Sequence, residues 1–559
     1  DEVPDRERCA GDGEGREETL MRQVMLLDCT LRDGAYIVDA EFGTPAIKGI
    51  IRRLQEANLE IIECGWLKDA PHKEGKTFYH VPDDIKPYLI EKNTGKSGSA
   101  LLVAMIDWDR YDLSNLPPCD HQTIGAIRVV FPKAHFREGI ALGRTIHGKG
   151  YQVFFQAANT MSYSDEELEA LAGAVNASDA RALSVVDTFG AMDYEDMGRI
   201  VGILDRNLRP EIMLGFHSHN NRQMSFAMSQ IFVQKLYGKR RVIIDASLCG
   251  MGRGAGNTTT ELMASFLNKK YHTGYDMNMI LDTIDTYMES FQSRYTWGYS
   301  TPYFIAGTYC AHVNNIAYLR DNHRTSALEM HSIISSLSES QRAQYDYDLL
   351  EQKYLEYRSQ AVDDHAVYDA LRAKWRDRRI LLLSPGTSLK KQREAIRAYI
   401  EKEKPVCIGI NAVSVEYEYD YLFFSNQMRY AYAKDVYPEV LQSKAKLLLS
   451  NIKNCAEAGE YIVNFNMLIK RGWPHFDNAT ILCLRLLSKL HVREVVLAGF
   501  DGFSDSHKDN YVDEELPRIN PGMSMDELNA EILEMFRDFR QSVQGQMDIT
   551  FITESKFAE

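Results

Sequence analysis

The chain has 559 residues, of which 45% are hydrophobic and 26% are charged, and its formal net charge is −15 at pH 7. This length predicts more than one domain, and the composition is typical of a soluble globular protein with a sizeable core. The negative charge argues against a general binder of nucleic acid or anionic membranes. No apolar run approaches the ~20 residues that a membrane-spanning helix needs, so neither nucleic acid nor membrane is expected as a partner.

The first segment, "DEVPDRERCAGDGEGREETL", is acidic and rich in glycine. It has no apolar stretch of the kind that a secretory signal contains, and we expect residues 1–20 to form a disordered extension. The nine cysteines are scattered without a C-x-x-C pair. This usage favours a reduced, cytoplasmic location over a disulfide framework.

Short apolar runs alternate with amphipathic segments over residues 21–275. Eight such runs follow one another: "VMLLDCT", "LEIIECGW", "ALLVAMI", "AIRVVF", "QVFFQAAN", "ALSVVDTF", "EIMLGFHSH" and "RVIIDASLCG". Apolar strands separated by helices are typical of a parallel sheet covered on both faces. Eight units over about 250 residues predict a (β/α)8 TIM barrel. A doubly wound open sheet is the alternative, because the number of repeats alone does not exclude it.

The remainder of the chain has two further parts. Residues 276–375 are rich in tyrosine and helix formers and lack alternating strands, so we expect a helical extension. A second α/β module begins with "RILLLSPGTSLKKQREAIRAYIEK", which has the pattern of a buried strand, a tight turn and an amphipathic helix. Further strand patterns follow at "PVCIGIN", "DYLFFSN", "KLLLSN", "REVVLAGFDG" and "MDITFIT". They predict a Rossmann-like domain over residues 376–559.

Functional side chains of a TIM barrel gather on the face where the strands end. Six of the eight predicted strands end near polar residues, namely Arg32 and Asp33, Glu63, Gln156, Asp187, His217 and His219, and Asn257. Residues i and i+2 of an extended backbone face the same side, so both histidines of "GFHSHN" can point into one site. Imidazole, carboxylate and amide oxygen suit a divalent metal such as Mn²⁺, Mg²⁺ or Zn²⁺. For the H-x-H pattern alone, a pair of merely hydrogen-bonded histidines is the alternative.

Five segments of the predicted barrel resemble the signature segments of the DRE-TIM metallolyases: "LLDCTLRDGAY", "IIECGW", "VVDTFG", "GFHSHNN" and "GMGRGAGNTTTE". That group includes 3-hydroxy-3-methylglutaryl-CoA lyase, 4-hydroxy-2-oxovalerate aldolase, and the isopropylmalate and homocitrate synthases. The resemblance covers residues 25–267, and the segments occur in the family's order. A fainter similarity to the helical extension of the aldolase continues through "WGYSTPYFIAGTYCAHVNNIAYL".

The resemblance implies roles for particular residues, carried over by matching positions. Asp33, His217 and His219 would bind a divalent metal, with Asn257 as a fourth ligand or a close neighbour. Arg32 would stabilise an enolate oxygen, and Glu63 would hold that arginine in place. A metal and an arginine aimed at the same oxygen both stabilise the charge that develops there.

Two positions depart from the family pattern. In the hydroxy-oxovalerate aldolases a histidine stands three residues after the metal-binding aspartate, where this chain has Tyr36. In the HMG-CoA lyases a reactive cysteine lies in the loop before the asparagine, whereas Cys249 is expected at a strand end. The acid/base group therefore stays open, with Tyr36 as a candidate and a pocket-wall aromatic as its alternative role. Gln156, Asn159 and Asp187 are candidates for substrate binding, or they brace strand ends.

The segment "SPGTSL" places a glycine between a strand and a helix, and such a turn can bring backbone N–H groups to a phosphate. With "DYLFFSN" and "DNATILCLRLLSKLHVREVVLAGFDGF", it resembles bacterial sialyltransferases that use CMP-sialic acid and a related family of glycan-associated proteins. The resemblance implies a nucleotide site lined by Gly386, Thr387, Ser388, Asn411 and Asn426. A Rossmann-like domain used for assembly or substrate delivery is the alternative.

Together these patterns predict a metal-dependent aldolase or lyase that acts on a 2-oxo acid, with pyruvate as the enolate-forming partner and an aldehyde as the second substrate. The second domain is predicted to bind a nucleotide or nucleotide-linked sugar, which would place the reaction in surface-glycan precursor synthesis. One alternative is a Claisen-type synthase that condenses an acyl-CoA with a 2-oxo acid. Another is a glycan-assembly binding or transferase protein with an inert barrel, although the joint presence of the residues implied to bind metal and enolate speaks against it. Assembly as a homo-oligomer stays open.

Overall fold

The computed structural model describes residues 23–89, 100–323, 325–358, 362–452, 461–475, 478–505, 510–517 and 524–558. The chain divides into two compact units, Asp1–Thr308 and Tyr309–Glu559. The extension predicted for residues 1–20 lies outside the described residues. The division between the units falls within the predicted helical extension of residues 276–375.

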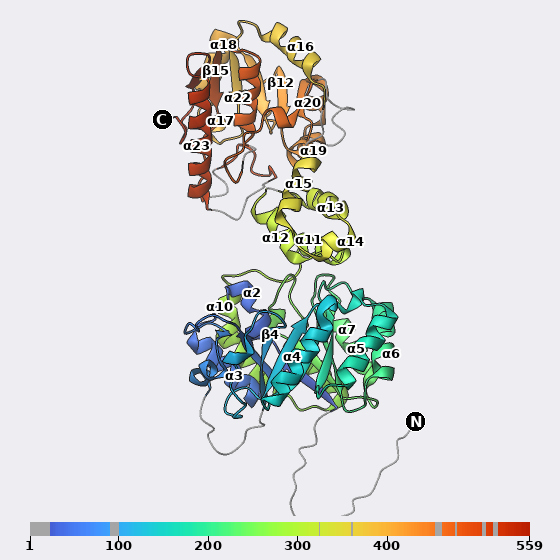
Figure 1. Cartoon of the computed structure of the whole chain (residues 1–559). Coiled ribbons are helices and arrows are strands. Elements are labelled where there is room, and N and C mark those ends of the chain that lie inside the picture. The colour runs from blue at the N-terminus through green and yellow to red at the C-terminus, as the bar shows by residue number, and fades with distance from the viewer. Residues whose placement is uncertain are drawn as a thin grey trace, which may run out of the picture. The chain divides into compact units, whose positions relative to one another are not determined.

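The first unit is a closed barrel of eight parallel strands with helices around it, as the sequence predicts (Figure 1). The sheet runs in the order β1-β9-β8-β7-β6-β5-β4-β2, and β1 pairs with β2. This last pairing closes the barrel and excludes the open sheet. The barrel strands are β1 (Val24–Asp28), β2 (Ile61–Leu67), β4 (Leu101–Asp107), β5 (Ala126–Phe131), β6 (Gln152–Ala157), β7 (Ala182–Asp187), β8 (Met213–Ser218) and β9 (Val242–Ala246). A short strand, β3 (Phe78–Tyr79), pairs with the end of β2.

The helices of the first unit bury one apolar face against the outside of the barrel. In α3, for example, the buried residues Ile47, Ile50, Ile51 and Leu54 recur at helical spacing. The helices between and after the strands are α1 (Thr30–Asp33), α2 (Ala35–Val38), α3 (Thr44–Glu56), α4 (Phe136–Gly148), α5 (Asp165–Asn176), α6 (Tyr194–Asn207), α7 (Ser225–Leu236) and α8 (Thr260–Tyr271). Short 3₁₀ turns are η1 (Pro82–Tyr88), η2 (Leu113–Asn115), η3 (Lys133–His135), η4 (Thr160–Ser162) and η5 (Leu248–Gly250). The unit ends with α9 (Met277–Thr283), the π-helical turn η6 (Ile284–Met288), α10 (Glu289–Gln292) and α11 (Thr301–Thr308).

Alternate residues of each barrel strand belong to two different cores. The outward-facing residues pack with the helices, as Leu26, Ile62 and Phe155 do. The inward-facing residues form a smaller cluster near the strand starts, which includes Met25 and Phe154. Further along the strands, the inward positions are polar. The barrel is therefore apolar at one end and carries its charged groups toward the carboxyl ends of the strands.

The second unit contains a seven-stranded, wholly parallel sheet, which confirms the predicted second α/β domain. Its strands are β10 (Ile380–Leu383), β11 (Val406–Ile410), β12 (Tyr421–Phe424), β13 (Ala445–Leu449), β14 (Tyr461–Val463), β15 (Glu494–Ala498) and β16 (Asp548–Phe551). The sequence predicts all of these strands except β14, whose apolar run is only three residues long.

Helices precede and cover this sheet (Figure 1). Those before it are α12 (Val313–Asp321), α13 (Ala327–Ser335), α14 (Glu339–Ala343), α15 (Tyr347–Arg358) and α16 (His365–Trp375). Those between and beside the strands are α17 (Ser388–Lys391), α18 (Arg393–Glu403), α19 (Gln427–Val436), α20 (Pro438–Ser443), the turn η7 (Phe465–Met467), α22 (Ala479–Lys489) and α23 (Met525–Ser542).

The strand order of the second sheet is β14-β13-β12-β11-β10-β15-β16. The chain therefore adds strands on one side of β10 and then crosses to its other side at β15. In open parallel sheets, ligands bind at the carboxyl ends of the strands where the order reverses in this way.

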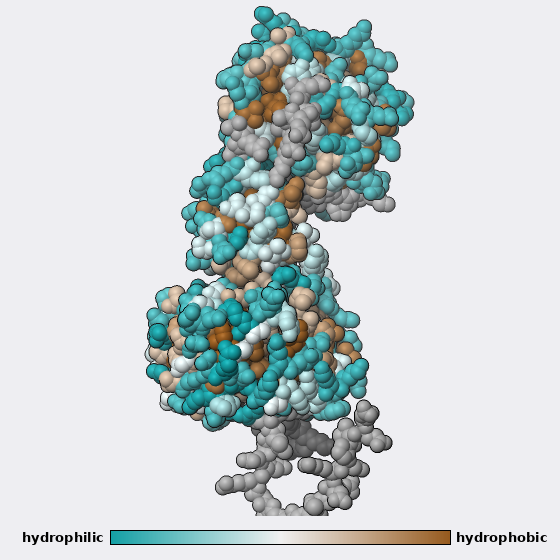
Figure 2. All heavy atoms as spheres, turned by 90° about the vertical axis from the view of Figure 1, so that its right-hand side faces the viewer, coloured by the Kyte–Doolittle hydropathy of each residue, from teal (hydrophilic) through white to brown (hydrophobic). Residues whose placement is uncertain are grey.

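On the face shown in Figure 2, hydrophilic residues cover most of the area and apolar residues form small patches. Among the described residues, no helix combines the length and the apolar composition needed to cross a membrane.

Arg240 forms a network of hydrogen bonds at the amino-terminal end of the barrel, away from the carboxyl ends of the strands. Its Nε donates to Asp205 Oδ1 at 2.7 Å. Its two remaining nitrogens donate to four backbone carbonyls, those of Asp205, Leu208, Arg209 and Ile212. The guanidinium thereby ties the end of α6 to the starts of β8 and β9.

We expect Arg240→Met to lower the free energy of unfolding by about 2–4 kcal/mol, because buried carbonyls lose their donors. The neighbouring Lys239 is exposed, so Lys239→Met is a matched control that should change stability little. Urea denaturation followed by circular dichroism measures both. Equal midpoints for the two variants would contradict this role of Arg240.

Candidate metal centre

The first turn after β1 places Arg32 and Asp33 inside the barrel mouth. Both side chains are buried, with exposed fractions of 4% and 1%. The chain can turn this tightly because the next residue is Gly34, where a side chain would clash with the carbonyl oxygen of Thr30 and with the side chain of Met251. The segment "TLRDG" thus forms the short helix α1 with both charged groups directed inward.

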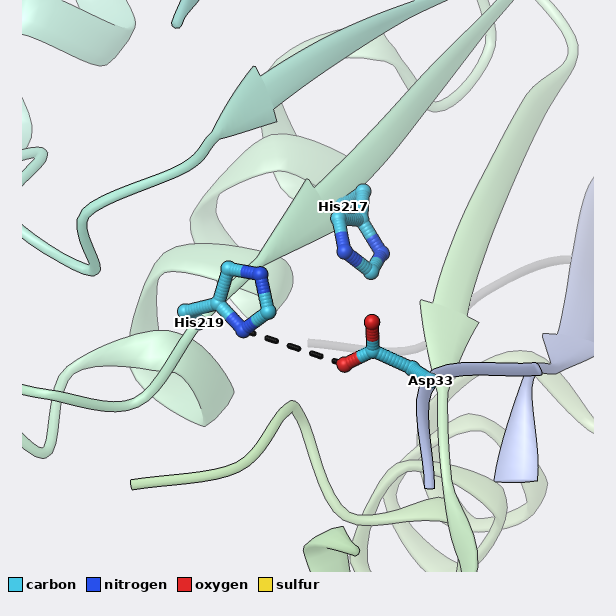
Figure 3. Close-up of side chains that lie close together, drawn as sticks. All are labelled: Asp33, His217 and His219. Carbon is cyan, nitrogen blue, oxygen red and sulfur yellow. Dashed lines mark ion pairs between the residues drawn. The ribbon is translucent and has the colours of Figure 1, made fainter. Parts of the chain in front are cut away.

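Asp33, His217 and His219 form a group that could hold a metal ion, with one ligand atom from each lying within 4.8 Å of the others. His217 is near the end of β8, and His219 lies just beyond it. The three side chains point toward one another from different elements (Figure 3). His219 Nδ1 lies 3.9 Å from Asp33 Oδ2, which is too far for a hydrogen bond but suits two ligands of one ion.

The protonation states of this group also fit a metal. Burial lowers the pKa of His219 to about 4, so its imidazole is neutral at pH 7 and has a free lone pair. Burial opposes the charge on Asp33, but the charge of Arg32 and the hydrogen bond from Asn257 act against it, and the pKa of Asp33 lies below its ordinary value. A neutral imidazole and an ionised carboxylate are the forms that bind a divalent cation.

Asn257 lies against Asp33 in the same site. Its Nδ2 donates to Asp33 Oδ2 at 2.7 Å and to the carbonyl of Met251 at 3.3 Å. Asn257 Oδ1 and His219 Nδ1 are buried and have no hydrogen-bond partner among the described residues. Buried polar atoms without partners are uncommon. Their position beside Asp33 supports the fit of a cation to this site.

A chain of buried charged side chains connects the candidate metal ligand His217 with Arg32. Arg32 Nε donates to Glu63 Oε2 at 2.8 Å, and Arg128 NH1 donates to the same oxygen at 2.8 Å. Arg128 NH2 donates to Asp245 Oδ2, and that oxygen lies 3.0 Å from His217 Nδ1. The candidate metal ligand His217 and the arginine Arg32 are therefore connected through two carboxylates and one further arginine.

Sequence reasoning missed Arg128 and Asp245. Each is a single charged letter inside an apolar strand, in "AIRVVF" and "VIIDA". Ala126 and Ile243, two residues earlier, belong to the inner core, so strand alternation places both charged side chains inside the barrel. That signal is present in the sequence.

The predicted substrate-binding residues are held by neighbouring groups. Gln156 is 2% exposed, accepts a hydrogen bond from Arg128 and donates one to Ser184 Oγ at 2.9 Å. Asp187 accepts from the backbone of Ala191 and from Ser218 Oγ, and burial raises its pKa to about 6. These contacts favour the bracing role that the sequence left open for both residues.

Asn159 follows β6 with a left-handed backbone (φ 50°). Its N–H donates to Thr188 Oγ1 at 2.8 Å, and its carbonyl accepts from Ser162 Oγ.

Glu63 and Gln156 lie within their strands, one layer deeper than the expected rim.

Tyr36 lies at the mouth of the barrel, and its side chain is 51% exposed. Its ring meets the edge of Trp66 with centroids 6.3 Å apart, and the guanidinium of Arg253 lies 5.1 Å from its centroid. Local desolvation raises the pKa of Tyr36 above its ordinary value. The phenolate is therefore less available here than in water.

The predicted nucleotide-binding residues lie at the carboxyl end of the second sheet. Gly386, Asn411 and Asn426 line a pocket between the ends of β10, β11, β12 and β15, together with Arg429, Asp501 and Tyr511. The lining formed by the described residues does not include Thr387 or Ser388. The pocket is at the place where the strand order reverses.

The glycine turn of "SPGTSL" already holds a carboxylate. Asp501 Oδ2 accepts from the backbone N–H of Ser388 at 2.8 Å, and Asp501 Oδ1 accepts from its hydroxyl. A side chain at Gly386 would clash with the same carboxylate. The donors expected to bind a phosphate are therefore occupied by an acidic side chain of the protein.

The amide groups of the other two predicted residues serve the fold. Asn411 exchanges hydrogen bonds with Ser425 through both its amide atoms. Asn426 caps α19 by accepting from the N–H of Arg429 at 3.1 Å.

Residues 134–286 match the HMGL-like family model. The matched range contains β6 to β9, His217, His219 and Asn257. The resemblance predicted for the barrel is confirmed at the level of this family. The likeness of the second domain to sialyltransferases stays a prediction.

Individual relatives are similar to about half of the chain. An oxaloacetate decarboxylase of Mycobacterium tuberculosis is 24% identical over 264 residues, which are 47% of this chain and 75% of the relative. A 4-hydroxy-2-oxovalerate aldolase of Geobacillus genomosp. 3 is 26% identical over 279 residues, with 48% and 78% covered. A solved structure described as the N-terminal domain of an aldolase from Bacteroides vulgatus has 24% identity and a TM-score of 0.44, and covers 52% of this chain and 95% of that one.

We expect Gly252→Ala to weaken metal binding while the fold is retained. A Cβ at this position would clash with Asn257 Nδ2 and Asp33 Oδ2, so both side chains must move. Gly202, within α6, has no atom within 4 Å of such a Cβ, and Gly202→Ala is the matched control. Titration with Mn²⁺ followed by calorimetry measures the affinity. Unchanged Mn²⁺ affinity in Gly252→Ala would contradict this assignment of the site.

Proposed function

We propose that the barrel is a divalent-metal-dependent lyase that makes or breaks a carbon–carbon bond through the enolate of a 2-oxo acid, with pyruvate as that acid and an aldehyde as the second substrate. The observation that carries this proposal is the convergence of Asp33, His217 and His219 beside the buried cation Arg32. The HMGL-like match and the relatives named as an aldolase and a decarboxylase support it.

The metal would be held by Asp33, His217 and His219, with the amide oxygen of Asn257 next to them. A bound divalent cation supplies Lewis-acid chemistry, because it polarises a carbonyl oxygen of the substrate. The donor set of imidazole and oxygen ligands is compatible with Mn²⁺, Mg²⁺ or Zn²⁺.

Arg32 is positioned to stabilise negative charge on the enolate oxygen. Burial opposes the charge on its guanidinium, but Glu63 and Asp33 outweigh it and raise the pKa of Arg32 above its ordinary value. Its Nε is bonded to Glu63 and its NH1 to Asp33 Oδ1 at 2.6 Å. The fork is thus fixed before substrate arrives, which is the condition under which a donor stabilises a transition state most.

The pocket of the second unit is proposed to bind a nucleotide or a nucleotide-linked sugar, which would place the reaction in surface-glycan precursor synthesis. Its position at the strand-order reversal supports a ligand site. Arg429 is 8% exposed and its guanidinium lies 4.7 Å from the Tyr511 ring centroid. A buried cation beside an aromatic face suits a phosphate and a base. Because Asp501 fills the Gly386 turn, the phosphate is expected at Arg429 instead.

We expect Arg32→Lys to fold and to retain metal, but its activity should be roughly 10²–10³-fold lower than that of the wild type. A lysine cannot reproduce the planar fork of donors. Exchange of the methyl protons of pyruvate into deuterated water, followed by NMR with added Mn²⁺, measures enolate formation without the aldehyde.

The outcomes of this exchange experiment separate the possible roles. Exchange by Arg32→Lys at the wild-type rate would show that Arg32 is only a counter-ion. A wild-type protein that holds metal without exchanging pyruvate protons would exclude pyruvate as the nucleophile. Release of CoA from acetyl-CoA in the presence of a 2-oxo acid would instead identify a Claisen-type synthase.

For the second unit, calorimetry of the full chain with cytidine monophosphate is expected to show binding that Arg429→Gln weakens at least tenfold. Arg376 is exposed on the same unit, and Arg376→Gln is the control for a general loss of positive charge. The absence of binding to the wild-type chain, by this nucleotide and by a nucleotide-linked sugar, would remove this half of the proposal.

A further inference from the structure

Asp107 is an inward-facing carboxyl group at the carboxyl end of β4. On this strand Leu102, Ala104 and Ile106 belong to the outer core, whereas Val103 belongs to the inner one. Because side chains alternate along a strand, Asp107 faces the barrel interior on the same side as Val103. It lies two positions beyond the last inward-facing apolar residue, Met105, at the mouth of the barrel.

The inward-facing charged groups deeper in the barrel are paired with one another. Glu63 accepts from two arginines, and Asp245 lies between Arg128 and His217. Asp107 differs from them. Its carboxylate has no hydrogen bond and no ion pair with any residue that the structure describes, and it is partly accessible to solvent. A carboxylate with free lone pairs at the mouth can exchange protons with a substrate.

Asp107 faces the same barrel mouth as the groups proposed to act on the enolate. Burial raises its pKa, and the charges of Arg110, Asp109, Lys68 and Arg32 act on it from its own loop, from the end of β2 and from α1. Its own charge acts in turn on the hydroxyl of Tyr36. The carboxylate therefore shares the barrel mouth with Arg32 and Tyr36.

We propose that Asp107 is the general base and acid of the reaction, an inference that rests on the proposed enolate chemistry. In the direction of bond formation, its carboxylate takes a proton from the methyl carbon of pyruvate. The C–H electron pair forms the carbon–carbon double bond of the enolate, and the carbonyl pair moves onto the oxygen that Arg32 stabilises. The enolate carbon then bonds to the aldehyde carbon, and the aldehyde oxygen, which receives the carbonyl pair, takes the same proton from Asp107.

The alternative base, Tyr36, is less suited to this step. Its pKa is raised from a value already near 10, so very little phenolate exists at neutral pH. Burial raises the pKa of the Asp107 carboxyl from its ordinary value, so its carboxylate is a stronger base than that of an unperturbed aspartate. Efficiency in general-base catalysis increases as the pKa approaches the working pH from below.

Two neighbouring aspartates allow a matched test. Asp107→Asn removes the base and keeps the shape of the side chain. Asp109→Asn removes an equal charge two residues away, from a side chain that is about half exposed. With Mn²⁺ present, we expect pyruvate proton exchange to fall roughly 10²–10⁴-fold in Asp107→Asn. In Asp109→Asn, which removes only one of the charges that act on Asp107, the rate should change far less. Metal content, measured in the same samples, should be equal in all three proteins.

A pH profile distinguishes a base from a residue that only supports the structure. In the wild type, the exchange rate should fall as the pH decreases through the pKa of Asp107, because protonation removes the base. Asp107→Glu should still show this fall in rate at low pH, whereas Asp107→Asn should not.

Two results would overturn the role of Asp107 as the base while leaving the enolate chemistry intact. One is pyruvate proton exchange by Asp107→Asn at the wild-type rate. The other is a tenfold or larger loss of exchange in Tyr36→Phe alone. A wild type that holds metal and shows no exchange would exclude pyruvate as the nucleophile, and with it the proton transfer from pyruvate that is proposed for Asp107.

Discussion

Arg128 is a cation enclosed in the barrel, 1% exposed, and the candidate site depends on how its charge is balanced. Taking an ion out of water costs several kcal/mol, and this cost is offset only when partners and hydrogen bonds surround it. Glu63 and Asp245 provide them on two sides. Glu63 also binds Arg32, and Asp245 contacts His217. The arginine that would face the enolate and the candidate metal ligand His217 therefore share one electrostatic support.

The same balance explains why the site is suited to a cation. Two arginines, Arg32 and Arg128, face three carboxylates, those of Asp33, Glu63 and Asp245, and His219 is neutral because burial lowers its pKa to about 4. The carboxylates outnumber the arginines by one, and this surplus of negative charge lies in a buried region where opposite charges attract strongly. A divalent cation reverses the sign of that charge. The geometry of the three ligands and the surplus charge therefore favour the same occupant.

Features of this arrangement that depend on neighbouring residues in the sequence can be predicted, whereas those that depend on contacts between distant segments cannot. The eight strands and the shared direction of His217 and His219 follow from local periodicity, and the predictions of the barrel and of the second parallel sheet are confirmed. Arg128, Asp245 and Asp107 also obey that periodicity, which predicts that they face the barrel interior. The sequence does not show which charged groups they meet there, because those groups come from other strands. Glu63 was expected at the rim because the bulge after it, between Glu63 and Trp66, is not visible in the letters.

The glycine turn of the second unit shows the limit of local patterns most clearly. "SPGTS" has the composition of a phosphate-binding turn, and the strand and helix around it form as predicted. The group that occupies its N–H donors, Asp501, comes from the end of β15, 113 residues later in the chain. Local sequence predicts that such a turn can bind an anion, and only the fold determines which anion is already there. A ligand of this pocket must therefore find its positive partner elsewhere, and Arg429 is a buried cation on the same lining.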